Sequence, residues 1–250
     1  MTSGGRSALG SNPSGRGLKE RVKTANKRSA SSTRWLDRQL NDPYVAEAKK
    51  RGFRSRAAFK LLQLDERFHF LQPGARVVDL GAAPGGWTQV AGEAVLKSAK
   101  GQPRGKVVGI DILKMDPVPG AEILHLDFMT EEAPEKLKAL LDGDADVVLS
   151  DMAASATGHQ RTDHLKIMAL AETAYVFAAE VLAPGGAFIA KVLQGGATGH
   201  LLKELKRDFE EVRHVKPAAS RKDSAEIYVV ALSFRGRVRE RPRSGPDSQI

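Results

Sequence analysis

The segment from residue 73 to residue 234 alternates short apolar runs with longer amphipathic stretches. Five apolar runs predict strands at 76–80, 106–112, 122–126, 146–150 and 187–193. Four stretches predict helices at 85–96, 131–141, 167–182 and 198–209, and the third has the clearest helical periodicity. Strands separated by helices form a mostly parallel sheet with helices on both faces, so the pattern predicts an α/β fold.

Two further strands, at 211–215 and 226–234, close the pattern. No segment long enough for a helix separates them. Parallel neighbours need a crossover connection, whereas antiparallel neighbours do not. We therefore expect the last strand to run antiparallel to its neighbours.

Two helices are predicted upstream of the sheet. Asp42 precedes a proline and predicts the N-cap of a helix that covers 44–50 and stops at Gly52. Ser55 predicts the cap of a second helix over 56–67, in which Lys60 lies off the apolar stripe.

The net charge of +9 is distributed unevenly along the 250 residues. Residues 1–60 carry 15 Lys and Arg against 4 Asp and Glu, residues 61–215 carry 16 against 22, and residues 216–250 carry 8 against 4. An acidic centre with basic ends favours a polyanionic partner, nucleic acid first, over a merely solvated surface. Residues 1–33 predict a flexible basic arm, and residues 235–250 predict a basic, disordered tail.

Composition excludes several classes of protein. The absence of cysteine excludes disulfides, thiolate metal sites and cysteine nucleophiles, and it fits a reducing compartment such as the cytoplasm. No apolar run approaches the roughly 18 residues of a membrane-spanning helix, so we expect no membrane partner. The six histidines show no metal-ligand spacing, and we expect no metal.

The most informative segment is Asp79-Leu80-Gly81-Ala82-Ala83-Pro84-Gly85-Gly86-Trp87, between the first predicted strand and its helix. An open α/β sheet binds its ligand at this place, and glycines let the backbone approach the ligand closely. The spacing fits neither the G-x-G-x-x-G fingerprint of nicotinamide cofactors nor a phosphate-binding P-loop. Asp79 adds negative charge where a dinucleotide would bring phosphate, so a ligand with a positive centre suits the loop better.

Acidic residues also follow the next two strands. Asp111 ends the second strand, where a carboxylate can accept both hydroxyls of a ribose. Asp127 follows the third strand, where it can accept from an adenine amino group. Each of these residues alone is explained equally well as a turn residue. A glycine-rich turn with acids after three successive strands fits S-adenosylmethionine, and the pattern predicts a methyltransferase-type domain.

Four further charged residues invite a common explanation: Lys60, Asp151, Lys191 and Glu226. Lys191 stands inside an apolar strand, where an ammonium is costly unless it is paired or faces a cleft. If the fourth, fifth and last strands are neighbours, Asp151, Lys191 and Glu226 meet at one edge of the sheet, over the cofactor. Lys60 would join them from the preceding helix. Two lysines and two carboxylates suit the activation of a weakly acidic hydroxyl, although each residue alone also has an ordinary structural explanation.

With these residues the chain resembles the FtsJ/RrmJ family of ribose 2′-O-methyltransferases, and most closely its bacterial branch that acts on large-subunit ribosomal RNA. The resemblance covers about residues 28–232. Its strongest segments are Ser32-Thr33-Arg34-Trp35-Leu36, Arg54-Ser55-Arg56-Ala57-Ala58-Phe59-Lys60-Leu61, the loop at 78–87, Ser150-Asp151-Met152-Ala153, Leu182-Ala183-Pro184-Gly185-Gly186 and Ser224-Ala225-Glu226-Ile227-Tyr228. It implies one methyltransferase domain over residues 34–234, with a Rossmann-like class I sheet of seven strands in the order 3-2-1-4-5-7-6.

The resemblance also implies roles for individual residues. The catalytic tetrad of the family falls on Lys60, Asp151, Lys191 and Glu226, with Lys191 as the base. The positions that bind S-adenosylmethionine fall on Gly85, Trp87, Asp111, Asp127 and Asp151. The implied reaction is methylation of a uridine 2′-hydroxyl in the A-loop of 23S ribosomal RNA, within the assembled 50S subunit, by a monomeric enzyme.

Two departures from the family touch the acceptor side. Ala154 and Ser155 stand where the family usually has Pro-Asn, and Ala58 stands where a tryptophan is frequent. A methyltransferase that modifies the 2′-hydroxyl of tRNA or another RNA therefore stays open. So does a catalytically silent RNA-binding factor of ribosome assembly on the same fold, although the intact tetrad favours an enzyme.

Overall fold

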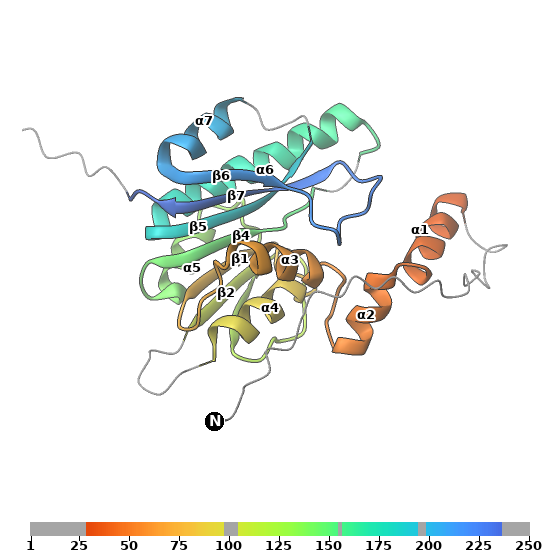
Figure 1. Ribbon diagram of the computed structural model, residues 1–250, viewed down its shortest axis with the longest axis horizontal. Coiled ribbons are helices and arrows are strands. Elements are labelled where there is room, and N and C mark those ends of the chain that lie inside the picture. The colour runs from red at the N-terminus through yellow and green to blue at the C-terminus, as the bar shows by residue number, and fades with distance from the viewer. Residues whose placement is uncertain (1–28, 98–104, 155–156, 195–198, 237–250) are drawn as a thin grey trace, which may run out of the picture.

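A computed structural model of the chain describes residues 29–97, 105–154, 157–194 and 199–236. Its centre is a seven-stranded sheet in the order β3-β2-β1-β4-β5-β7-β6 (Figure 1). The strands are β1 (Arg76–Leu80), β2 (Lys106–Asp111), β3 (Ala121–His125), β4 (Ala145–Ser150), β5 (Leu182–Leu193), β6 (Phe209–Val215) and β7 (Glu226–Phe234). β1 to β5 pair in parallel, and β7 pairs antiparallel with both β5 and β6. The predicted Rossmann-like class I topology and the antiparallel last strand are confirmed.

Helices cover both faces of the sheet (Figure 1). One core contains residues of α2 (Pro43–Arg51), α3 (Ala58–Phe68) and α4 (Gly86–Val95), and the other contains residues of α5 (Ala133–Leu141), α6 (Gln160–Val181) and α7 (Gly199–Asp208). Successive side chains of a strand point to opposite faces, so Val77 belongs to the first core and Val78 to the second. Burial on both faces explains why the central strands read as continuous apolar runs.

The N-terminal boundary differs from the predicted one. Helix α1 (Ala30–Leu40) begins inside the segment that the sequence predicted as an arm over residues 1–33. Ser29 is its N-cap, and its hydroxyl accepts the backbone N–H of Ser32 at 3.3 Å. The first turn of α1 is polar, so apolar periodicity gives no signal for the start of this helix. Residues 1–28 and 237–250, which hold the rest of the arm and most of the predicted tail, lie outside the described residues.

Two local predictions are wrong. Ser55 does not cap α3, whose N-cap is Ala57, because the Ser55 hydroxyl is buried against Gly86 at the start of α4. Strand β5 begins at Leu182, directly after α6, and not at residue 187 as predicted. The Pro-Gly-Gly segment instead lies within β5, where the register with β4 shifts. Within the described ranges, no helix has the length and hydropathy that crossing a membrane requires.

Candidate active site

The four residues of the predicted tetrad lie at the edge of the sheet where the parallel strands end. Asp151 follows β4, Lys191 is near the end of β5, Glu226 begins β7 and Lys60 is on α3. In the antiparallel pair, Lys191 is opposite Tyr228 and Leu193 is opposite Glu226. The start of β7 therefore meets the end of β5, as the sequence predicts.

The tetrad consists of two ion pairs. Lys191 Nζ is 3.1 Å from Asp151 Oδ1 and also donates to the backbone oxygen of Asp151 at 2.7 Å. Lys60 Nζ is 3.2 Å from Glu226 Oε2. Both lysines are buried, with 5% of Lys191 and 7% of Lys60 exposed. The three residues meet at one edge as predicted, but Glu226 lies two residues before Tyr228, the direct neighbour of Lys191 on β7, and pairs with Lys60 rather than with Lys191.

Tyr228 joins the two ion pairs, and the sequence analysis assigned it no role. Its hydroxyl accepts from Lys60 Nζ at 3.0 Å and donates to Asp151 Oδ1 at 2.8 Å. Burial, together with the charges of Asp151 and Glu226, raises the pKa of Tyr228 well above its ordinary value, so the hydroxyl keeps the proton that it donates. The available signal was its position two residues after Glu226, on the same face of the strand.

A buried carboxyl group lies near the end of β1, just before the glycine-rich loop. Asp79 is fully buried, and its Oδ2 accepts from the Thr88 hydroxyl at 2.7 Å. Its Oδ1 has no hydrogen-bond partner among the described residues. Burial raises the pKa of Asp79 to about 7, and the charges of Asp151 and Asp111 act in the same direction. A buried carboxyl oxygen without a partner fits a ligand with a positive centre, as the sulfonium and ammonium of S-adenosylmethionine provide.

Backbone geometry explains the glycines of this loop. Gly81 has a φ of +82° and Gly85 a φ of +111°, which is a region that favours glycine. A Cβ atom on Gly81 would lie 2.8 Å from Cγ of Met152, and one on Gly85 would lie 3.0 Å from Cδ of Arg54. Arg54 donates to the carbonyl of Pro84 at 3.3 Å and so covers the loop. The loop therefore fits closely between the end of β4 and the segment before α3.

A cavity of about 110 Å³ opens at the ends of β2, β3 and β4, and Asp111 and Asp127 both line it. Asp111 accepts the backbone N–H groups of Ala83 at 2.9 Å and Leu113 at 2.7 Å. Asp127 accepts the N–H of Met129 at 2.9 Å. These bonds orient the carboxylates and leave further lone pairs for hydroxyl and amino donors. The two acids are thus brought together as the sequence predicts.

Trp87 and Gly85 do not line this cavity. The Trp87 indole N–H donates to the backbone oxygen of Ala57 at 2.9 Å, and the ring packs on Tyr228 with centroids 5.6 Å apart. Trp87 therefore connects the cofactor loop with α3 and with the tetrad. That Gly85, Trp87 and Asp151 bind the cofactor stays a prediction.

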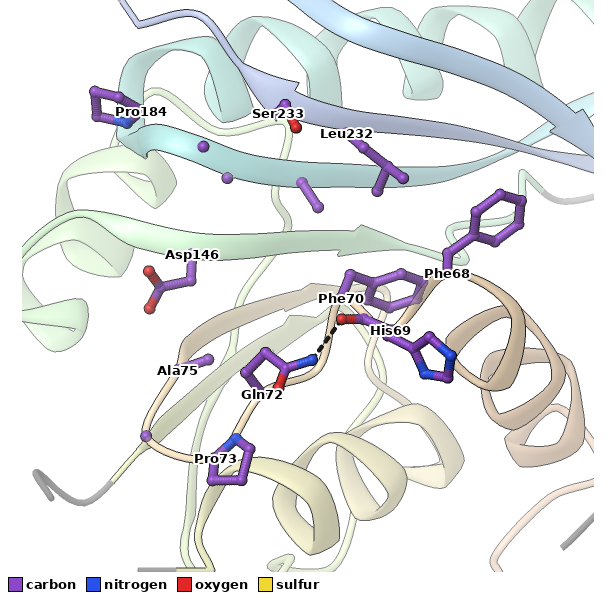
Figure 2. Close-up of a pocket in the computed structure, with 14 residues that line it drawn as sticks. Phe68, His69, Phe70, Gln72, Pro73, Ala75, Asp146, Pro184, Leu232 and Ser233 are labelled. Carbon is purple, nitrogen blue, oxygen red and sulfur yellow. Dashed lines mark hydrogen bonds between the residues drawn. The ribbon is translucent and has the colours of Figure 1, made fainter.

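Two other cavities flank the fold. One of about 680 Å³ lies beside the cofactor loop and is lined by Arg54, Pro84 and the loop at 113–116. Another, of about 630 Å³, is lined by Asp146 and Pro184 near the beginnings of β4 and β5 and by Phe68 and Phe70 after α3 (Figure 2). Open α/β sheets bind ligands at the carboxyl ends of their strands, so the tetrad and the cavity at Asp111 form the candidate active site. The described residues hold no cluster of His, Asp or Glu suited to a metal ion.

Comparisons with known proteins agree with this assignment. The model of the FtsJ-like methyltransferase family matches residues 53–234. The ribosomal RNA large subunit methyltransferase E of Parvibaculum lavamentivorans is 61% identical over 239 residues, which cover 94% of each chain. The protein of the same name from Azorhizobium caulinodans is 62% identical over 224 residues, 90% of this chain and 92% of that protein.

A solved structure shares the fold. A protein of Plasmodium falciparum assigned as a ribosomal RNA methyltransferase is 34% identical, with a TM-score of 0.62 over 74% of this chain and 100% of that chain. The family model covers most of the chain. The cofactor is S-adenosylmethionine, and the buried Asp79 and the acids of the cavity fit it. The chain therefore belongs to the FtsJ-like methyltransferase family.

Proposed function

We propose that the protein methylates the ribose 2′-hydroxyl of a uridine in the A-loop of 23S ribosomal RNA, within the assembled 50S subunit in the cytoplasm. The relatives named as ribosomal RNA large subunit methyltransferase E and the resemblance of the tetrad support this substrate. The observation that carries the chemistry is the contact of Lys191 Nζ with two oxygens of Asp151, one in an ion pair and one in a hydrogen bond.

Lys191 is the base in this proposal. A neutral amine has two N–H groups and one lone pair, and Lys191 Nζ has two acceptors, Oδ1 and the backbone oxygen of Asp151. A neutral Lys191 would use both N–H groups for these two oxygens. Its lone pair would then point toward the hydroxyl of the bound acceptor. It would accept the proton of the 2′-hydroxyl as the ribose oxygen attacks.

Lys60 stabilises the charge that develops on the ribose oxygen. Its ammonium donates to Glu226 and to the hydroxyl of Tyr228, which leaves a third N–H for the acceptor. Glu226 orients Lys60, and Tyr228 connects this ammonium to Asp151. A preorganised ammonium in a buried site stabilises negative charge in the transition state more strongly than water does.

The cofactor supplies an electrophilic methyl carbon when it is bound. Asp79 would face its positive centre, Asp111 its ribose hydroxyls and Asp127 its adenine amino group. The fold then holds the reacting groups together, because the loop after β1 and the tetrad share one edge of the sheet. Such positioning converts a bimolecular step into an effectively unimolecular one.

Unpaired basic side chains support an RNA substrate. Arg38, Lys49 and Lys50 are exposed and have no ion pair among the described residues. Lys136 on α5, by contrast, is paired with Glu132 at 2.9 Å. The cations of α1 and α2 are therefore available to neutralise the phosphates of an RNA backbone.

The test is a map of 2′-O-methyl marks in ribosomal RNA and tRNA from cells with the wild-type protein and with Lys191→Ala. We expect one uridine mark in 23S ribosomal RNA that disappears in the variant, while calorimetry gives an unchanged affinity for S-adenosylmethionine. A mark that depends on the protein in tRNA instead, or on a base atom, would replace the proposed substrate. Near-normal turnover of Lys191→Ala on purified 50S subunits would remove Lys191 as the base.

A further inference from the structure

A buried carboxylate near the tetrad holds two guanidinium groups. Asp42 is the N-cap of α2, where Oδ1 accepts the backbone N–H of Tyr44 at 3.0 Å. Its Oδ2 is 2.9 Å from Arg56 Nε and 3.4 Å from Arg221 Nη2. The Arg56 N–H points off this line, so the contact is an ion pair rather than a hydrogen bond. Only 7% of the Asp42 side chain is exposed, so the pairing is screened less than a surface pair would be.

The same cluster fastens the loop between β6 and β7. Arg56 Nη2 donates to the backbone oxygen of Ala219, and the N–H of Ala219 donates to Oε1 of Gln63 at 2.8 Å. Gln63 in turn donates to the hydroxyl of Tyr44 at 3.2 Å. This loop ends at Glu226, the first residue of β7. The position of the loop therefore determines where the carboxylate of Glu226 lies.

Arg56 and Lys60 are two cations beside one carboxylate. Lys60 pairs with Glu226 at 3.2 Å, and Arg56 lies near enough for Glu226 to influence it. Burial lowers the pKa of Arg56, whereas the charges of Asp42 and Glu226 oppose that shift, Asp42 more strongly. Asp42 thus pairs with a guanidinium on which Glu226 also acts.

We infer that Asp42 is a positioning residue for methyl transfer: by pairing with Arg56 and Arg221 it keeps Glu226 available to Lys60. This inference rests on the role proposed above for Lys60 and Glu226. It does not depend on which nucleotide accepts the methyl group. No contact of Asp42 with the cofactor or the acceptor is involved.

The test substitutes Asp42→Asn, which keeps an N-cap for α2 but removes the charge. Glu66→Gln is the matched control, because Glu66 is an exposed acid on α3 that makes no ion pair with the tetrad among the described residues. The assay counts labelled methyl groups transferred from S-adenosylmethionine to ribosomal RNA in 50S subunits, whatever atom accepts them. We expect Asp42→Asn to lower kcat about tenfold and to leave the KM for S-adenosylmethionine within about twofold, since only the acceptor side loses its alignment.

A second substitution separates positioning from simple loss of stability. Adding Arg56→Gln to Asp42→Asn removes the uncompensated guanidinium, and Gln63 still holds Ala219. We expect the double variant to recover most of the lost kcat, because Arg56 then no longer competes with Lys60 for Glu226. A kcat of Asp42→Asn equal to that of the control, or additive losses in the double variant, would overturn the inference. If Asp42→Asn alone is too unstable to assay, a double variant as inactive as Lys191→Ala would overturn it too.

Discussion

Replacing Asp79 by Asn tests how the fold tolerates a carboxyl group beneath the cofactor loop. Burial raises the pKa of Asp79 from 3.8 to about 7 in the folded protein. Between about pH 4 and pH 7 the folded state therefore binds a proton that the unfolded state releases, and the free energy of unfolding falls as the pH rises through this window. One pKa unit corresponds to about 1.4 kcal/mol, so the total loss is about 4 kcal/mol, of which about 3 kcal/mol falls between about pH 5 and pH 8.

The assay is urea denaturation of the cofactor-free protein at about pH 5 and at about pH 8. We expect the wild type to lose about 3 kcal/mol more than Asp79→Asn over this interval. Asp65, whose pKa burial also raises, contributes equally to both proteins and cancels. Asp144→Asn, which removes an exposed acid, should behave as the wild type. Equal pH dependence of Asp79→Asn and the wild type would refute the reasoning.

Three further predictions concern the active site and the RNA surface. Tyr228→Phe removes the hydroxyl between the two ion pairs and should lower kcat about tenfold at an unchanged KM for S-adenosylmethionine; an unaltered kcat would mean that the pairs act independently. Asp111→Ala should weaken S-adenosylmethionine binding about tenfold or more in calorimetry, and an unchanged affinity would contradict its assignment to the cofactor ribose. Exchanging Lys49 and Lys50 for Glu should reduce the slope of log K against log salt by about 2 in RNA binding, whereas Lys136→Glu should not; equal slopes would place the RNA elsewhere.

Much of the fold could be predicted because its signals are local. The strands β1 and β7 have the predicted bounds, since each apolar run is buried on both faces and ends at polar residues. The start of α1 could not be predicted in this way, because its first turn consists of Ala and Ser and has no apolar period. The strand order came from the resemblance to a family, since local patterns do not say which strands are neighbours.

The candidate site was predictable in its members and not in its pairing. A lysine in an apolar strand demands a partner, and Lys191 has one in Asp151. Which acid each lysine contacts depends on the register of β5 against β7, which the sequence leaves open. No role in the site was predicted for Tyr228, because an aromatic residue in a buried strand is ordinarily explained as core packing. Its hydroxyl becomes informative only when Lys60 and Asp151 are placed on either side of it.

The contact between the rings of Trp87 and Tyr228 has a consequence for how the enzyme is assembled. One ring belongs to the helix after the cofactor loop and the other to the strand that completes the tetrad. In the proposed mechanism, methyl donor and acceptor would therefore lie on either side of this one aromatic contact. Any substitution that tilts one ring disturbs both halves at once, so kinetic effects of Trp87 variants will not separate into a donor part and an acceptor part.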